Sequence, residues 1–172
     1  MSEKTAAEQL KEQLFLKRKN GRLTSDEAVL NKAQEYCEGY KDFLNRAKTE
    51  REAVKAAVKA AEEKGFKKFE YGKTYDAGDK VYINNRGKTL ALAVIGKQPV
   101  ENGVNITAAH IDSPRLDLKP NPLYEDVDLA LFKTHYYGGI KKYQWTAVPL
   151  ALHGVFVLKD GTVKEVSVGE KD

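Results

Sequence analysis

Cysteine is almost absent from this sequence, since Cys37 is the only one among 172 residues. A single cysteine excludes an internal disulfide framework and a cluster of thiolate metal ligands. Long apolar runs are missing as well, because none approaches the roughly 20 residues that a helix needs to cross a bilayer. The polar first residues lack the apolar segment of a signal peptide. We therefore expect a soluble, cytoplasmic protein with no membrane partner.

Charge of one sign is not strongly concentrated along the chain. The 29 basic and 25 acidic residues leave a formal net charge of only +4. The two signs interleave, notably along residues 46–70. Nucleic-acid binding requires a one-signed patch, which only Lys17-Arg18-Lys19 and Lys141-Lys142 approach. We therefore expect no nucleic-acid partner, and the 41% of hydrophobic residues favours a folded globular protein.

Helical periodicity dominates the first third of the chain. Residues 5–17 predict a short amphipathic helix that Asn20-Gly21 would end, because glycine adopts the left-handed cap conformation at little cost. Thr24 is the expected N-cap of the next helix, with Glu27 completing a capping box. On that helix we expect Cys37 to be a small buried hydrophobic residue. It lies on an apolar stripe with nearly 3.6-residue spacing, made of Leu30, Ala33, Cys37, Tyr40, Leu44 and Ala47.

A second capping box, from Thr49 to Glu52, predicts another helix that runs to Lys64, with Gly65 just beyond its end. The adjacent carboxylates Glu62-Glu63 near its end could act as a general base and a metal ligand. Neighbouring helical residues point about 100° apart, however, so we expect exposed charges. The buried face of the helix would consist of Val54, Ala57, Val58 and Ala61.

Strand-like patterns follow from residue 66. Residues 80–84 and 89–95 predict a hairpin that turns at Asn84-Asn85-Arg86-Gly87. Residues 103–109, which are β-branched or small and carry no charge, predict a buried strand. Helices followed by strands favour an α/β sandwich with its site at the carboxyl ends of the strands.

The sequence pattern changes after Pro114. Residues 116–122 predict a proline-marked connector, and strands are expected over 128–136, 145–158 and 162–168, the last two joined by a turn at Lys159-Asp160-Gly161. Proline and glycine near residues 112–122 mark a domain boundary. The remaining stretch of about 50 residues is too short to bury a good core alone.

His110 is the strongest candidate for a functional residue. It stands where the strand over 103–109 should end, and Pro114 prevents that strand from continuing. A neutral imidazole can offer one ring nitrogen to a metal. In an extended chain residues i and i+2 point to the same side, so Asp112 can lie beside His110 and orient its ring.

The wider set of motifs carries a family resemblance. The stretch from Ala108 to Pro114 is followed by Leu118-Lys119-Pro120, by Tyr137-Gly138-Gly139 and by Trp145. Together these motifs resemble the aspartyl aminopeptidase and aminopeptidase I family of zinc metallopeptidases. Residues 43–52 are also similar to the family's N-terminal helical region.

This resemblance implies a zinc metalloaminopeptidase, a hydrolase that removes N-terminal residues from peptides. A co-catalytic centre of that kind holds two zinc ions, which activate a water and polarise the scissile carbonyl. His110 matches the family's first metal ligand. Asp112 matches the catalytic carboxylate that orients a ligand without binding the metal itself. Dimers that assemble into homo-oligomeric dodecamers are implied as well.

The resemblance also divides the chain. Residues 1–118 would be the N-terminal part of the catalytic α/β domain, and residues 119–172 would begin an inserted β-rich dimerisation domain. The family's remaining metal ligands and general base lie beyond residue 172, and Glu62-Glu63 precedes His110, so it is not the family's Glu-Glu pair. We therefore expect the N-terminal portion of a longer enzyme, inactive by itself.

Other side chains have simpler interpretations. We expect His135 to pack against Tyr136 or Tyr137, and His153 to be a hydrogen-bonded core or interface residue. Tyr137, Gly138 and Gly139 could shape either the active site or a subunit contact. Ser113 has no base placed beside it by the sequence, so a serine nucleophile is not expected.

Two other functional classes stay open at this stage. A non-catalytic module could use exposed apolar strands for self-association. RNA or DNA binding through the basic residues is a weaker third hypothesis.

Overall fold

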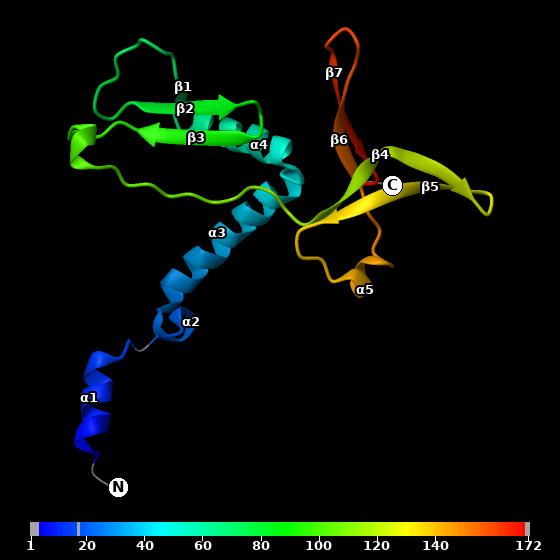
Figure 1. Cartoon of the computed structure of the whole chain (residues 1–172). Coiled ribbons are helices and arrows are strands. Elements are labelled where there is room, and N and C mark those ends of the chain that lie inside the picture. Colours follow the sequence, from blue (N-terminus) through cyan, green and yellow to red (C-terminus); the bar gives the residue numbers. More distant parts are fainter. Residues whose placement is uncertain (1–3, 17, 171–172) are drawn as a thin grey trace. The chain divides into compact units, whose positions relative to one another are not determined.

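The computed structural model describes residues 4–16 and 18–170. The chain divides into two compact units, residues 1–41 and residues 42–172 (Figure 1). The first unit holds helices alone among its described residues, and every strand lies in the second. The predicted order of helices followed by strands is therefore correct.

The first unit begins with helix α1, Ala6–Leu14. Thr5 caps it and forms a capping box in which the Glu8 carboxylate accepts from the Thr5 backbone N–H at 2.8 Å. The predicted helix over 5–17 is confirmed over these residues, and its predicted last residue lies outside the described ones. Leu10 and Leu14 of its apolar side are exposed.

The boundary between the next two helices differs from the prediction. Asn20 does not end the first helix but caps a short helix α2, Gly21–Thr24, by accepting from the Arg22 N–H at 3.0 Å. Helix α3, Glu27–Arg46, starts two residues later than expected, because its cap is Asp26 rather than Thr24: the Asp26 carboxylate accepts from the Val29 N–H at 2.8 Å. Asn, Thr and Asp are all good caps, so composition alone did not decide between them.

The apolar stripe of α3 is present but is not buried, since no residue of this helix is buried. Cys37 in particular is an exposed free thiol, so the prediction of a buried cysteine is wrong. Periodicity defines which side of a helix is apolar, whereas burial requires another element to cover that side.

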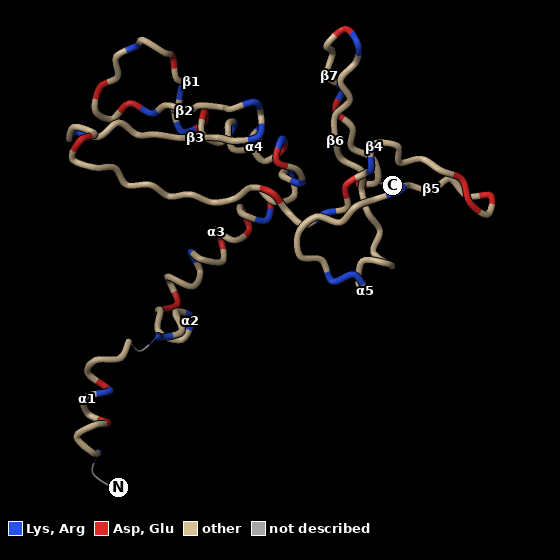
Figure 2. Tube along the Cα trace, in the orientation of Figure 1, with Lys and Arg blue, Asp and Glu red and all other residues tan. Residues whose placement is uncertain are grey.

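The second unit is organised around helix α4, Glu50–Glu63. The predicted capping box is present: Thr49 Oγ1 accepts from the Glu52 N–H, and the Glu52 carboxylate accepts from the Thr49 N–H at 2.9 Å. Lys64 caps the far end, and Gly65 has the left-handed φ of 83° that the prediction required. Both basic and acidic residues occur along this helix (Figure 2). Glu62 and Glu63 are exposed, as expected.

A three-stranded sheet packs against α4. Strand β1, Lys67–Lys68, runs parallel to β2, Lys80–Asn85, which pairs antiparallel with β3, Thr89–Val94. The predicted hairpin is confirmed, and it turns through positive φ angles at Arg86 and Gly87. The buried hydrophobic residues of the described chain gather in this unit and are Ala47, Ala53, Val54, Ala61, Val81 and Tyr82.

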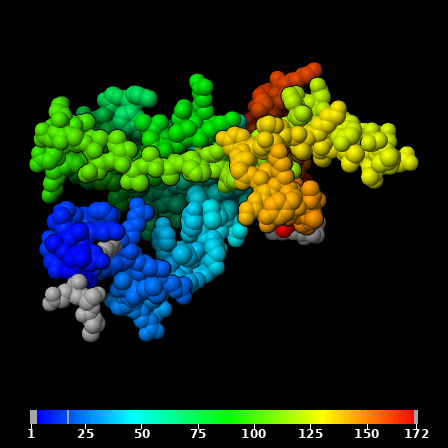
Figure 3. Space-filling model, turned by 60° about the horizontal axis from the view of Figure 1, so that its bottom comes forward, coloured from blue at the N-terminus to red at the C-terminus, as the bar shows by residue number. Residues whose placement is uncertain are grey.

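Residues 103–109 do not form the buried strand that was predicted. They follow a 3-10 helix, Val100–Asn102, and are exposed and unpaired, with Ile106 81% exposed. In Figure 3 this light-green segment between β3 and β4 lies at the surface. An apolar, β-branched sequence favours an extended chain, but a strand also needs a neighbour to accept its backbone hydrogen bonds, and no described residue supplies one.

The predicted connector over 116–122 is also wrong, because it lies inside a long strand β4, Arg115–Asp126. This strand pairs antiparallel with β5, Leu129–Tyr137. The register shifts between Leu118 and Leu123, so that Lys133 alone opposes residues 119–122. Prolines at 120 and 122 cannot donate to a ladder, and they fall within this irregularity.

The last elements are a short helix α5, Lys142–Trp145, and the antiparallel pair β6, Leu152–Val157, and β7, Val163–Val168. The predicted strand over 145–158 is thus correct only in its second half. The predicted turn at 159–161 is confirmed, with Gly161 at a φ of 85°. Among the described residues, no helix is long and apolar enough to cross a membrane.

Candidate functional site

His110 and Asp112 line a pocket of about 530 Å³ in the second unit. The pocket lies between the start of α4, the edge of β3 and the end of β5. Its polar lining consists of Glu50, Lys88, Thr89, His110, Asp112 and Tyr137. A larger pocket of about 1120 Å³ contains neither His110 nor Asp112. We place the candidate site in the smaller pocket because of its chemistry.

The histidine and the carboxylate lie together as predicted. His110 Nδ1 is 3.1 Å from Asp112 Oδ1 and 3.0 Å from the Asp112 carbonyl oxygen. With the proton on Nδ1, this nitrogen donates to Asp112, and Nε2 keeps its lone pair. The imidazole is 83% exposed, and its Nε2 has no hydrogen-bond partner among the described residues. Nε2 is therefore the atom that can bind a ligand.

The second oxygen of Asp112 is held by Tyr137. The Tyr137 hydroxyl donates to Asp112 Oδ2 at 2.9 Å. This hydrogen bond is the main reason why the pKa of Asp112 lies below its ordinary value, with His110 contributing less. The same bond raises the pKa of Tyr137, because ionised Tyr137 would face the carboxylate. At neutral pH, Asp112 is therefore a carboxylate and Tyr137 a neutral donor.

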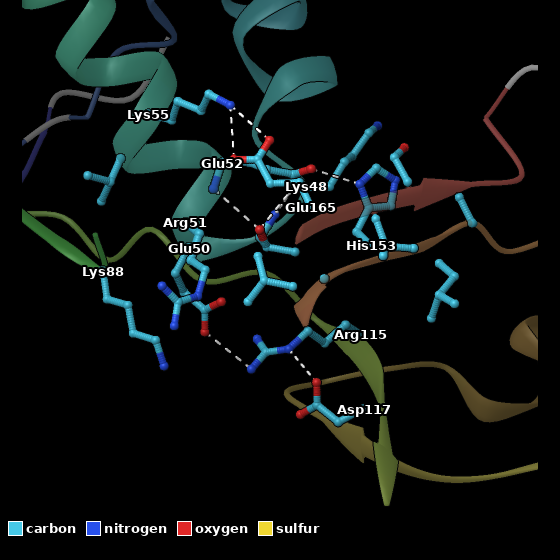
Figure 4. Close-up of a pocket in the computed structure, with 18 of the residues that line it drawn as sticks. Lys48, Glu50, Arg51, Glu52, Lys55, Lys88, Arg115, Asp117, His153 and Glu165 are labelled. Carbon is cyan, nitrogen blue, oxygen red and sulfur yellow. Dashed lines mark hydrogen bonds and ion pairs between the residues drawn. The ribbon is translucent and has the colours of Figure 1, made fainter. Parts of the chain in front are cut away.

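Arg115 contacts the aromatic ring of Tyr137. Its guanidinium lies 4.1 Å from the centre of the Tyr137 ring, a cation–π contact. The same guanidinium forms ion pairs with Asp117 at 2.7 Å and with Glu50 at 3.3 Å, which Figure 4 shows as dashed lines. Arg115 was not predicted from the sequence. Arg115 pairs with Tyr137 in the β4–β5 ladder. This pairing could not be foreseen while residues 116–122 were predicted to be a connector.

The two glycines after Tyr137 differ in their surroundings. Gly138 has a φ of 75°, and a Cβ there would lie 3.3 Å from the Cα of Pro114. A side chain at this position would therefore be strained, and glycine is favoured where the end of β5 meets the chain beside Asp112. At Gly139 a Cβ would meet nothing within 4 Å. Of the two glycines, Gly138 is thus the one that lies close to the segment carrying Asp112.

The residues present suit one corner of a zinc site. An imidazole nitrogen is a common zinc ligand, and the bond from Nδ1 to a carboxylate is typical of such histidines. Zinc takes about four ligands, and the described residues hold no group of three or more side chains able to bind a metal. His110 fits as a single ligand of a centre that these residues do not complete.

The other two histidines lie elsewhere. His135 stacks on Tyr136, with ring centres 5.5 Å apart, as predicted. His153 is only 12% exposed and lines the larger pocket (Figure 4). Its Nδ1 lies 2.8 Å from Glu52 and its Nε2 2.8 Å from Glu170, so it is hydrogen-bonded as predicted. Both ring nitrogens of His153 are engaged, so neither is available to a metal.

The comparison with protein families defines the class of this protein. Residues 43–171, about three quarters of the chain, match the family model described as aminopeptidase I zinc metalloprotease (M18). The match assigns the chain to a family of zinc metalloproteases. It belongs to the aminopeptidase I (M18) family, which confirms the predicted resemblance.

Individual relatives agree. A "probable M18 family aminopeptidase 1" of Clostridium acetobutylicum is 58% identical over 137 residues, which cover 77% of this chain and 30% of that protein. The crystal structure of aminopeptidase I from Borrelia burgdorferi B31 matches with a TM-score of 0.83 and 43% identity, over 90% of this chain and 39% of that one. Aminopeptidase I from Clostridium acetobutylicum matches with a TM-score of 0.76 and 50% identity, over 92% of this chain and 36% of that one. These structures confirm the mixed α/β class.

The chain spans about a third of the length of the curated relatives that it matches. This coverage agrees with the expectation of a portion of a longer enzyme.

Proposed function

We propose that this chain is the N-terminal portion of a two-zinc aminopeptidase that hydrolyses N-terminal residues from peptides. Residues 1–118 belong to the catalytic domain, and residues 119–172 begin an inserted β-rich dimerisation domain. The observation that carries the proposal is the His110–Asp112 pair, whose free Nε2 faces solvent at a pocket, in a chain of the M18 family.

The chemistry assigned to this chain is limited to one ligand and its support. Asp112 keeps the His110 proton on Nδ1 and so presents Nε2 as a lone-pair donor. Bound zinc would lower the pKa of a water and polarise the peptide carbonyl. The remaining ligands and the general base come from the part of the enzyme that the chain does not cover. The isolated chain is therefore expected to be inactive.

Assembly and location complete the proposal. The enzyme acts on peptides in the cytoplasm as a homo-oligomer of dimers, which form a dodecamer when the chain is complete. Sedimentation of the complete protein should show a single large species of about twelve subunits. A stable monomer would contradict this part of the proposal without affecting the zinc site.

The test of the site is His110→Ala in the complete protein. It should remove most peptidase activity and lower the metal content by one zinc ion per active site. His135→Ala is the matched control, because His135 is exposed and only stacks on Tyr136. Activity and two bound zinc ions per chain in the His110 variant would show that the assignment is wrong.

A second candidate, a non-catalytic self-association module, is favoured by one observation. The β6–β7 pair exposes Phe156, Val157 and Val163 by 62%, 67% and 57%. Such surface can mediate association. This module predicts a discrete oligomer of the isolated chain, whereas a partial enzyme predicts aggregation of uncovered apolar surface. Sedimentation of residues 1–172 separates the two.

A further inference from the structure

Tyr137 belongs to the part of the chain that we assign to the inserted domain, yet it contacts the candidate metal site. It is the last residue of β5, and its hydroxyl reaches Asp112, which lies 25 residues earlier. The strand ladder fixes the backbone at this point, because Tyr137 pairs with Arg115. The residue that follows Pro114 and the residue that precedes Gly138 therefore face each other.

The Tyr137 ring is fixed by Arg115 as well. The guanidinium that covers the ring is itself bound to Glu50 on α4 and to Asp117 on β4. An arginine held by two carboxylates has few other orientations available, so the ring that it covers is restrained too. Tyr137 is thus tied both to its own sheet and to the helix of the catalytic part.

The close approach of Gly138 to Pro114 helps to place the Tyr137 hydroxyl beside Asp112. Pro114 lies 3.3 Å from the position of a Cβ at Gly138, so the end of β5 can lie directly against the segment that carries Asp112. A residue with a side chain would push this end away, and the Tyr137 hydroxyl would move with it.

The result is a hydrogen-bonded row of three residues, in which Tyr137 and His110 each donate to a different oxygen of Asp112. Tyr137 occupies Oδ2 of Asp112 and leaves Oδ1 toward Nδ1 of His110. Tyr137 is 42% exposed, so water competes for this bond and its contribution to stability is small. Its effect falls instead on the rotation of the carboxylate, and through it on the ring of His110.

We propose that Tyr137 is a positioning residue of the zinc site: it orients Asp112, which in turn orients the ligand His110, and it thereby connects the inserted domain to the metal. This inference rests on the proposed role of His110. Partners that orient a zinc ligand change metal affinity by about 10–100-fold when mutated. Tyr137 acts one bond further away, so we expect about a threefold to tenfold effect.

The experiment compares Tyr137→Phe with Tyr136→Phe in the complete protein. Both changes remove only a hydroxyl, and Tyr136 contributes its ring to contacts with His135 and Lys142. Zinc affinity is measured by competition with a chromophoric chelator. Tyr137→Phe should weaken zinc binding about threefold to tenfold, and Tyr136→Phe should leave it unchanged.

A second readout needs no zinc and no activity. Long-range ¹H–¹⁵N correlation spectra of the metal-free protein report which ring nitrogen of His110 carries the proton. The native protein and Tyr136→Phe should show the proton on Nδ1, and Tyr137→Phe should show a mixture of tautomers. Unchanged tautomer and unchanged zinc affinity in Tyr137→Phe would overturn the positioning role. If His110→Ala also left zinc affinity unchanged, the proposed site itself would be wrong.

Discussion

The attachment of β6 to helix α4 offers the sharpest test of the energetics of this structure. His153 on β6 bonds to Glu52 on α4 through Nδ1 and to Glu170, which follows β7, through Nε2, each at 2.8 Å. When the imidazole is protonated, both ring N–H groups donate to carboxylates. His153→Ala removes both bonds and leaves two carboxylates without this partner.

The magnitude follows from the exposure of these groups. A hydrogen bond to a charged group contributes about 1.5–3 kcal/mol, but Glu52 and Glu170 are 31% and 41% exposed, so water screens both. Allowing for that screening, we expect a total loss of about 2 kcal/mol. This corresponds to about a 30-fold change in an opening equilibrium.

The loss should depend on pH in a defined direction. Partial burial disfavours charged His153, but the two carboxylates outweigh it and raise the pKa above the ordinary 6.5. Burial likewise opposes ionisation of Glu52, but His153 and Thr49 outweigh it and lower the pKa below the ordinary 4.5. The histidine contribution is therefore complete below about 6.5 and is lost as pH rises through the folded pKa. The Glu52 contribution is complete above about 4.5 and is lost as pH falls through its folded pKa.

Hydrogen exchange of the β6–β7 amides in the complete protein measures this local opening. Between about pH 4.5 and 6.5, His153→Ala should speed exchange about 30-fold after correction for the intrinsic rate. The difference should shrink at higher pH, where the native histidine is neutral. The neighbouring charges, Lys55 paired with Glu165, remain in both proteins. His135→Ala is the control. An effect that is independent of pH would refute the ionic explanation.

Two further changes test single features of the fold. Thr49→Ala removes the N-cap of α4 and should lower the free energy of unfolding by about 1 kcal/mol. Thr162→Ala, at an exposed turn position where the backbone N–H still donates to Asp160, should cost less. Equal thermal shifts of the two variants would argue against the cap. Gly138→Ala should strain a φ of 75° and displace the Tyr137 hydroxyl, so zinc affinity of the complete protein should fall, while Gly139→Ala should leave it intact. Equal zinc affinities in the two glycine variants would contradict the close contact with Pro114.

Features that depend on neighbours three or four residues apart were predictable from the sequence. The capping box from Thr49 to Glu52 and the turn at Gly87 are examples, because the interacting groups are fixed by local chain geometry. Cys37 and residues 103–109 were not predictable in the same way. Their apolar character was recognised correctly, but burial and pairing depend on which other segment covers them.

The same distinction applies to the candidate site: contacts between residues close in the sequence were predictable, and contacts that depend on strand pairing were not. His110 and Asp112 are two residues apart, so an extended chain was enough to predict that they touch. Tyr137 was selected with its glycines, but its bond to Asp112 requires the β4–β5 register. Prolines within β4 concealed that register, since proline normally argues against a paired strand. Arg115 was missed for the same reason.

Glu52 carries a consequence for how mutations combine. One of its oxygens belongs to the capping box with Thr49 and the other to His153. Thr49 and His153 share this carboxylate, although they come from elements about a hundred residues apart. Removing either partner frees Glu52 to strengthen its bond with the other, so the two losses should not add. A sequence change at the start of a helix thereby alters how much the protein tolerates a change in a distant hairpin.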